Sequence, residues 1–209
     1  MDIAELLAVN RIRCQCDIQS KKRVVQTVAE VLGASLRQAA ERPGDEVEGD
    51  AVGVRENIDG KTEARTRNGE KHGEVRRLLS LRSRQSDADE AQEPPSDMDI
   101  MDALIARERL GATGIGKGVA LPHSRLAGIE APIGALLTLE AGVDYESGDG
   151  TAVDIVFGLL VPEQCNDTHL KILAELARRF NDDSLRDSLR RFESSEAVMG
   201  FLSALPATA

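Results

Sequence analysis

The chain has 209 residues and a formal net charge of −10 at pH 7, from 26 Lys and Arg against 36 Asp and Glu. This acidic balance disfavours a nucleic-acid-binding protein, whose interface is normally basic, and one Tyr, four Phe and no Trp offer few surfaces for base stacking. No stretch reaches the roughly 18 consecutive apolar residues of a membrane span, and the first residues lack the basic-then-apolar order of a signal peptide. We therefore expect a cytoplasmic protein without membrane insertion.

The three cysteines indicate neither a disulfide framework nor a metal site. Cys14 and Cys16 are separated by one residue and Cys165 lies far along the chain, so the ligand spacing of a zinc site is absent. We expect Cys14 and Cys16 to be small buried residues of a strand. We expect no metal and no cofactor.

The first 40 residues predict a strand followed by a helix. Residues 12–18 alternate apolar and polar, which places Ile12, Cys14, Cys16 and Ile18 on one face of a half-buried strand. Ser20 is typical of a helix N-cap, and apolar residues then recur at helical spacing over residues 21–32. Gly33 either ends this helix or is crossed, with the helix then continuing to residue 40.

Residues 41–97 differ in composition from the rest of the chain. They interleave charges with Gly and Pro and contain few large apolar residues in no sustained period. Such a segment cannot bury enough surface to offset the entropy lost on ordering it. We therefore predict a single domain formed by residues 1–40 and 98–209, with a low-complexity, disordered insertion between them. Loop-closure entropy grows slowly with length, so the fold can accommodate the insertion.

The rest of the chain alternates helices and strands. A helix capped by Asp97 or Asp99, carrying Leu110 and ended by Gly111, comes first. Apolar strands are expected at residues 119–121, 133–139 and 153–161, and helices at about 168–180 with Leu170 on the inner side, 183–192 and 195–205. The last strand is apolar throughout, which is typical of a strand buried on both faces. The alternation predicts an α/β fold, a mixed β-sheet flanked by helices.

The most informative motif is LGATGIGKGVALPHSR, residues 110–125. A glycine-rich segment leads into a short apolar strand that stops at Pro122, because proline cannot donate to a sheet. His123 is therefore expected at a strand end, beside a loop rich in free amide groups. A nucleophilic nitrogen next to such an anion-binding loop indicates chemistry on a phosphoryl group.

A nucleotide-binding P-loop is the rival interpretation of this motif. The segment from Gly111 to Lys117 fits GxxxxGK, but Gly118 stands where the magnesium-binding Ser or Thr is required. A P-loop also joins a strand to a following helix, whereas here a helix is expected before the motif and a strand after it. The sequence therefore disfavours a nucleotide-binding enzyme.

Residues 107–126, RERLGATGIGKGVALPHSRL, closely resemble the active-site signature of type-2 IIA (EIIA) domains of the bacterial phosphoenolpyruvate-dependent phosphotransferase system (PTS), particularly the nitrogen-regulatory IIA proteins. Residues 153–180 are similar to the family's strand and the helix bearing its second histidine. With residues 6–36 and the C-terminal helices, the resemblance covers the chain outside the insertion. Three motif positions differ from the residues usual in the family: Ala112 for Ser, Lys117 for the Asn common in the nitrogen type, and Ser124 for Gly.

The resemblance implies that His123 becomes a tele-phosphohistidine, phosphorylated on Nε2 by a small carrier protein of the HPr or NPr type. It also implies that His169 is the companion histidine and Arg107 the cation near the phosphate. Phosphoryl transfer depends on positioning and charge stabilisation, which loop amides and an arginine can supply without a metal. At a helix start, the dipole should keep His169 uncharged. We further expect Gly114, Gly116 and Thr113 to support the phosphate, although the Thr113 hydroxyl could instead only support the turn.

The resemblance favours a cytoplasmic phosphocarrier of the nitrogen-type branch that regulates target proteins, a phosphohistidine relay component rather than an enzyme with independent turnover. One alternative is a sugar-specific IIA component, of the fructose or mannitol type, that passes the phosphoryl group to a IIB domain; the absence of an attached IIB, IIC or HPr-like region favours the regulatory role. Another is a protein-interaction module that has lost phosphotransfer, against which the joint presence of His123, His169 and Arg107 argues.

Overall fold

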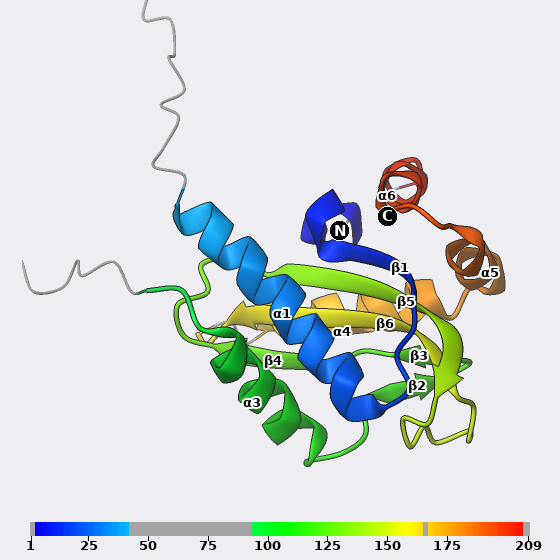
Figure 1. Cartoon of the computed structure of the whole chain (residues 1–209), viewed down its shortest axis with the longest axis horizontal. Helices are drawn as coiled ribbons and strands as arrows, with labels where there is room; N and C mark the ends of the chain where they lie inside the picture. Colours follow the sequence, from blue (N-terminus) through cyan, green and yellow to red (C-terminus); the bar gives the residue numbers. More distant parts are fainter. Residues whose placement is uncertain (1–2, 42–92, 165–166, 207–209) are drawn as a thin grey trace, which may run out of the picture. The chain divides into compact units, whose positions relative to one another are not determined.

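The computed structural model describes residues 3–41, 93–164 and 167–206, all within the compact unit formed by Met1–Pro43 and Glu93–Ala209 (Figure 1). Most of the segment for which we predict an insertion, residues 42–92, lies outside the described residues, as does Cys165. Among the described residues, no helix is long and apolar enough to cross a membrane.

The elements alternate much as the sequence predicts. The short 3-10 helices η1 (Ile3–Leu6) and η2 (Val9–Arg11) are followed by β1 (Ile12–Cys16), α1 (Lys21–Ala40), α3 (Asp97–Glu108), β2 (Gly114–Gly116), β3 (Val119–Ala120), β4 (His123–Leu126), β5 (Ile133–Val143), β6 (Val153–Pro162), α4 (Asp167–Phe180), α5 (Asp183–Arg191) and α6 (Ser195–Ser203). The predicted fold class, a mixed sheet flanked by helices, is confirmed.

Strand β6 is the centre of the sheet, which has the order β1-β5-β6-β3-β2. β5 runs antiparallel to β6, whereas β3 and β4 pair with it in parallel, one after the other along its length. This central position explains why the sequence of β6 is almost wholly apolar, since a strand with neighbours on both edges and helices on both faces meets no water. Among the described strands β4 pairs only with β6, so it forms an edge of the sheet.

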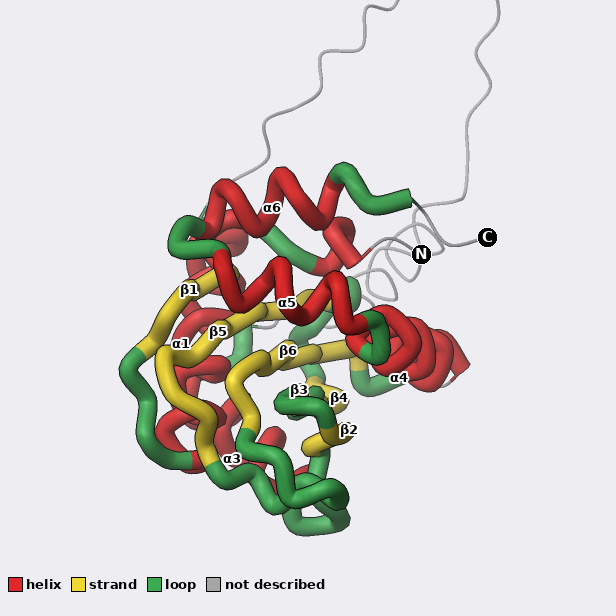
Figure 2. Tube along the Cα trace, turned by 90° about the vertical axis from the view of Figure 1, so that its right-hand side faces the viewer, coloured by secondary structure: helices red, strands yellow, loops and turns green. Residues whose placement is uncertain are grey.

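Two helical layers cover the two faces of the sheet (Figures 1 and 2). Helices α1 and α3 pack on one face and α4, α5 and α6 on the other, each with its own apolar core. Consecutive β6 residues alternate between these cores, Val156 facing α1 and Phe157 facing the C-terminal helices. At Gly158 a Cβ would lie 2.3 Å from Val28 Cγ1, so glycine lets α1 approach the sheet closely.

Strand β1 departs from the predicted alternation. Gln15 has φ +50° and the pairing of β1 with β5 shifts register between Arg13 and Cys16, which is the geometry of a bulge. The extra residue turns the strand, so Cys14 packs against the core under α4 to α6 and Cys16 against the core under α1 and α3. The prediction that both cysteines share one buried face is therefore wrong; both are only half-buried.

At the junction of α1 and α3, the structure decides between the two predicted ends of α1 and corrects the predicted start of α3. Helix α1 crosses Gly33, where a Cβ would lie 1.8 Å from a carboxylate oxygen of Asp97. The N-cap of α3 is Ser96, with Asp99 completing a capping box, rather than Asp97 or Asp99. Asp97 is thus the first helical residue, and it binds Arg37 of α1 at 2.6 Å.

Two apolar side chains predicted to point inward are exposed instead. Helix α3 ends at Glu108, so Leu110 lies beyond it and is 85% exposed. Leu170 is on the outer side of α4 and is 64% exposed.

Candidate functional site

The structure brings His123 and His169 together from distant parts of the chain. Their ring centroids are 5.3 Å apart and the rings meet edge to face, with 8% and 7% of the residues exposed. His123 opens β4 rather than ending β3, because the carbonyl of Pro122 accepts a hydrogen bond from Leu159 and pairing with β6 resumes there. His169 lies in the first turn of α4, which directly follows β6 and its loop.

The hydrogen bonds of His123 define its neutral tautomer. Nδ1 lies 2.7 Å from the carbonyl oxygen of Leu121, which can only accept, so Nδ1 carries the proton. The Nε–H of Arg107 donates to Nε2 at 3.0 Å, so Nε2 holds the lone pair. Burial lowers the pKa of His123 below the ordinary 6.5. The hydrogen bond that Nδ1–H donates to the Leu121 carbonyl opposes this shift, and the Arg107 charge adds to it. An uncharged ring with its lone pair on Nε2 is the nucleophilic form.

Arg107 reaches His123 around the edge of the sheet. It belongs to the last turn of α3, on the opposite face from α4, and its Nη1–H also donates to the Gly111 carbonyl at 3.0 Å. Because β4 is an edge strand, groups from both helical layers can meet there. The guanidinium is thereby placed between the glycine-rich loop and the imidazole.

His169 is held by a cation that the sequence motif does not reveal. The Nε–H of Arg125 donates to His169 Nδ1 at 3.2 Å, while His169 Nε2 is buried without a partner among the described residues. Burial is the largest cause of a lowered pKa for His169, and the charges of His123, Arg125 and Arg107 lower it further. His169 is therefore neutral, as its place at a helix start predicts, but mainly because of desolvation.

Thr113 is engaged by a carboxylate. Its backbone N–H donates to Glu108 at 3.1 Å and its hydroxyl donates to the same carboxylate. The ammonium of Lys21 lies 2.9 Å from Glu108 Oε1, the oxygen that also accepts the Thr113 N–H, and balances the carboxylate charge. Of the two predicted roles for Thr113, this geometry favours support of the turn. Glu108, the sequence neighbour of Arg107, forms its ion pair with Lys21.

Gly114 and Gly116 form β2 and lie against the loop that follows β5. A Cβ on Gly114 would be 2.4 Å from Ser147 Oγ, and one on Gly116, with φ +88°, would be 2.9 Å from Asp149 Oδ2. Their lack of side chains therefore lets that loop approach the hairpin. The role that we predict for them at the phosphate stays a prediction.

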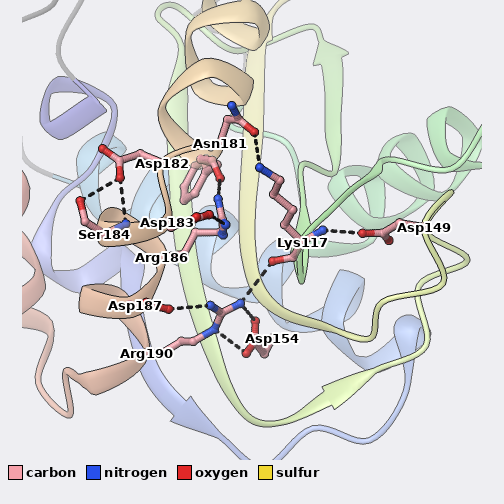
Figure 3. Close-up of polar contacts among 11 residues, drawn as sticks. Lys117, Asp149, Asp154, Asn181, Asp182, Asp183, Ser184, Arg186, Asp187 and Arg190 are labelled. Atoms are coloured by element: carbon pink, nitrogen blue, oxygen red, sulfur yellow. Dashed lines mark hydrogen bonds and ion pairs between the residues drawn. The ribbon is translucent and has the colours of Figure 1, made fainter.

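The β2–β3 turn is fastened to the C-terminal helices at Lys117 (Figure 3). Lys117 has φ +55°, and its ammonium donates to Asn181 at 2.7 Å. Its carbonyl accepts from Arg190, which also binds Asp154 through two contacts of 2.8 and 3.0 Å. With α3 before the motif and β3 after it, the P-loop interpretation fails on context.

Two residues of the site were not identified by sequence reasoning. Arg125 follows His123 by two positions in a strand, a spacing that puts both on one face and could have drawn attention to it. Glu108 carried no local signal for its bonds to Thr113 and Lys21. Within the described part of the chain, no group of three or more His, Cys, Asp or Glu residues could hold a metal ion.

Comparisons with known proteins identify the family of the chain. Residues 84–204 match the family model described as phosphoenolpyruvate-dependent sugar phosphotransferase system, EIIA 2. The chain belongs to this family. Among PTS EIIA 2 relatives, the nitrogen regulatory protein of Pseudomonas aeruginosa is 46% identical over 99 residues, 47% of this chain and 64% of that protein. That of Bradyrhizobium diazoefficiens is 41% identical over 110 residues, 53% of this chain and 72% of that protein.

A solved structure resembles the whole fold. The nitrogen regulatory protein IIA-Ntr from Neisseria meningitidis has a TM-score of 0.65 and 27% identity, and the match covers 96% of this chain and 98% of that one. By sequence, however, the matched part of this chain spans less than two thirds of the Pseudomonas protein.

Proposed function

We propose that this protein is a cytoplasmic phosphocarrier of the nitrogen-type branch, which accepts a phosphoryl group on His123 Nε2 from an HPr-like or NPr-like carrier and regulates target proteins according to its phosphorylation state. The observation that carries the proposal is the tautomer of His123. A neutral, largely buried ring with its proton on Nδ1 and its lone pair on Nε2 is prepared for attack on phosphorus.

The transfer step is a direct exchange between two imidazoles. The Nε2 lone pair of His123 forms a bond to phosphorus as the phosphorus–nitrogen bond of the donor phosphohistidine breaks and the donor ring keeps its electron pair. His123 retains its Nδ1 proton, so its ring gains positive charge. The Leu121 carbonyl, 2.7 Å from Nδ1, stabilises that charge where it develops.

Arg107 has two successive positions in this scheme. Its Nε–H occupies the Nε2 lone pair in the resting protein, so it must leave before the attack. The guanidinium then neutralises the phosphoryl oxygens, for which its planar set of donors is suited. His169, whose buried Nε2 has no partner in the described part of the chain, would bind a phosphoryl oxygen as well.

Exposed apolar side chains near the histidines favour docking of a protein donor. Leu170 adjoins His169, Leu110 adjoins the Gly111 carbonyl that binds Arg107, and Ile115 lies in β2; they are 64%, 85% and 44% exposed. Large apolar side chains exposed beside a functional centre are suited to contact with a protein partner. The small carrier would cover these three side chains as it delivers its phosphoryl group.

The nitrogen-type branch is proposed because both curated relatives above are named nitrogen regulatory proteins. The family description itself names a sugar phosphotransferase system, so a sugar-specific IIA component that passes the group to a IIB domain is the second candidate. Incubating the phosphorylated protein with isolated IIB domains of the fructose and mannitol types separates the two, since only the sugar-specific component would lose its phosphoryl group at a productive rate.

The direct test is intact mass after incubation with phosphoenolpyruvate, Enzyme I and an HPr-like or NPr-like carrier. We expect an acid-labile gain of one phosphoryl group in the wild type and none in His123→Gln. The His169→Gln variant, which keeps the nucleophile, should gain the group more slowly.

No gain by the folded wild type with either carrier would refute the phosphocarrier proposal and favour the interaction module. Equal gain by His123→Gln would place the acceptor elsewhere.

A further inference from the structure

One ring nitrogen of His169 has no hydrogen-bond partner among the residues that the structure describes, and its chemical nature can be deduced. A guanidinium only donates, so the Nδ1 atom that receives the Arg125 Nε–H at 3.2 Å must hold a lone pair. A neutral histidine has one protonated nitrogen, which is then Nε2. The buried atom without a partner is therefore an N–H donor, and a buried donor left unpaired is costly unless a ligand satisfies it.

We propose that Arg125 is a positioning residue that fixes His169 as the neutral Nε2–H tautomer, so that its free donor receives an oxygen of the phosphoryl group on His123. The inference rests on the proposed function for the identity of that oxygen. It adds a residue and a role, because the sequence motif marks the two histidines and Arg107 but assigns nothing to Arg125.

The two histidines are held in opposite tautomers. His123 donates from Nδ1 to Leu121 and presents a lone pair at Nε2, whereas His169 accepts at Nδ1 from Arg125 and presents a proton at Nε2. With the ring centroids 5.3 Å apart, a group bound to one ring lies within reach of the other. A nucleophile and a hydrogen-bond donor thus lie side by side, the first oriented by a backbone carbonyl and the second by an arginine side chain.

Strand β4 supplies both the nucleophile and the residue that orients its companion. His123 and Arg125 pair in register with Leu159 and Val161 of β6, and both of those partners belong to the core under α4 to α6. Alternate residues of a strand share a face, so β4 presents His123 and Arg125 together toward α4. The charge of Arg125 also contributes to the lowered pKa of His169, after burial and the influence of His123.

The tautomers can be read from ring ¹⁵N chemical shifts in the full-length protein, which has only three histidines. In the wild type we expect His169 Nδ1 to be unprotonated and Nε2 protonated. In Arg125→Glu the carboxylate should accept from Nδ1 and invert this pattern, and Arg125→Leu should raise the pKa of His169. Arg125→Lys, which keeps a charged donor, should preserve the wild-type tautomer, and Arg191→Leu is a control at an exposed arginine.

The rate of phosphoryl acceptance supplies the second readout. Loss of one hydrogen-bond donor to a developing oxyanion slows a reaction by about 100-fold or more. We expect a decrease of this size in the transfer rate of Arg125→Glu. The rate of Arg125→Leu should be intermediate, and that of Arg125→Lys should be close to the wild-type rate. A protonated Nδ1 on His169 in the wild type would overturn the proposal, whether or not any variant folds. So would Arg125→Lys if it slowed transfer as much as Arg125→Leu while preserving the tautomer, since Arg125 would then touch the phosphate itself. Failure of the wild type to accept a phosphoryl group would refute the proposed function. The ¹⁵N chemical shifts would still test whether Arg125 fixes the tautomer of His169.

Discussion

The two ends of the β2–β3 hairpin are held by arginines in opposite ways. At the turn, Arg190 binds a carboxylate, Asp154, and the Lys117 carbonyl, so each charge meets an opposite charge or an acceptor. Beyond the open end, Arg107 and Arg125 donate to uncharged imidazoles, and one ring nitrogen is left without a partner among the described residues. The hydrogen bonds at the turn stabilise the fold, whereas the arrangement beyond the open end leaves a hydrogen-bond donor for an incoming anion.

The largest expected difference between the two ends of the hairpin is in the rate of phosphoryl transfer. Arg107→Leu removes the cation that would neutralise the phosphoryl oxygens, so the rate of phosphoryl acceptance should fall by about 100-fold. Quenched-flow sampling with intact-mass detection measures this rate. Arg109→Leu changes an exposed arginine two residues away and should transfer normally. A normal rate for Arg107→Leu would show that Arg107 does not act on the phosphate.

A smaller effect, on stability, is expected at the turn. Arg190→Leu leaves Asp154 and the Lys117 carbonyl without a donor, which should lower the free energy of unfolding by about 1–2 kcal/mol after allowance for partial exposure. Urea unfolding measures it, with Arg191→Leu as the matched control at an exposed neighbour. If Arg190→Leu instead slowed transfer without loss of stability, the division between the two ends would be wrong.

The pH dependence of stability should arise at the histidine end. Burial lowers the pKa of His123 and of His169 below the ordinary 6.5, so the unfolded chain binds more protons than the native one as pH falls below that value. The stabilising contribution is complete above about pH 6.5 and is lost as pH falls through the lowered pKa values. Urea unfolding between pH 5 and 8, as approximate limits, should show this slope, reduced in His123→Gln and His169→Gln. An unchanged slope in both variants would contradict it.

The smallest effect is expected at Lys117. Lys117→Asn loses the exposed contact with Asn181, but asparagine tolerates the positive φ of +55° better than lysine. The two changes should nearly cancel, leaving the free energy of unfolding within about 0.5 kcal/mol of the wild type. A much larger loss would mean that the lysine ammonium itself fastens the turn.

Much of the fold could be predicted from the sequence because it depends on local periodicity. The apolar run of β6 indicates a buried strand, and the apolar spacing in α1 indicates a helix with one buried face, whichever elements pack against them. Prediction failed at the bulge of Gln15, which turned Cys14 and Cys16 to opposite faces. The sequence left open whether α1 ends at Gly33 or crosses it, and the close approach of the Asp97 side chain in the folded protein explains why glycine stands within the helix.

The structure also shows on which side of β4 one departure from the family motif lies. Ser124, which replaces the usual Gly, follows His123 directly, so in the sequence its side chain adjoins the proposed phosphorylation site. Strand β4 instead alternates, and the next residue of the same parity, Leu126, packs against the core under α1 and α3. Ser124 therefore faces away from the side that carries His123 and Arg125.

By itself the sequence determined the order of elements, the buried central strand, the glycine-rich motif and the residue types for phosphoryl chemistry, since these follow from backbone geometry and side-chain chemistry. Only the tertiary structure decided which atom of each histidine carries the proton. That choice depends on the Leu121 carbonyl for His123 and on Arg125 for His169, and the second of these contacts joins residues 44 positions apart. The contact between Arg125 and His169 arises only when β4 and α4 are packed together, because no local pattern encodes it.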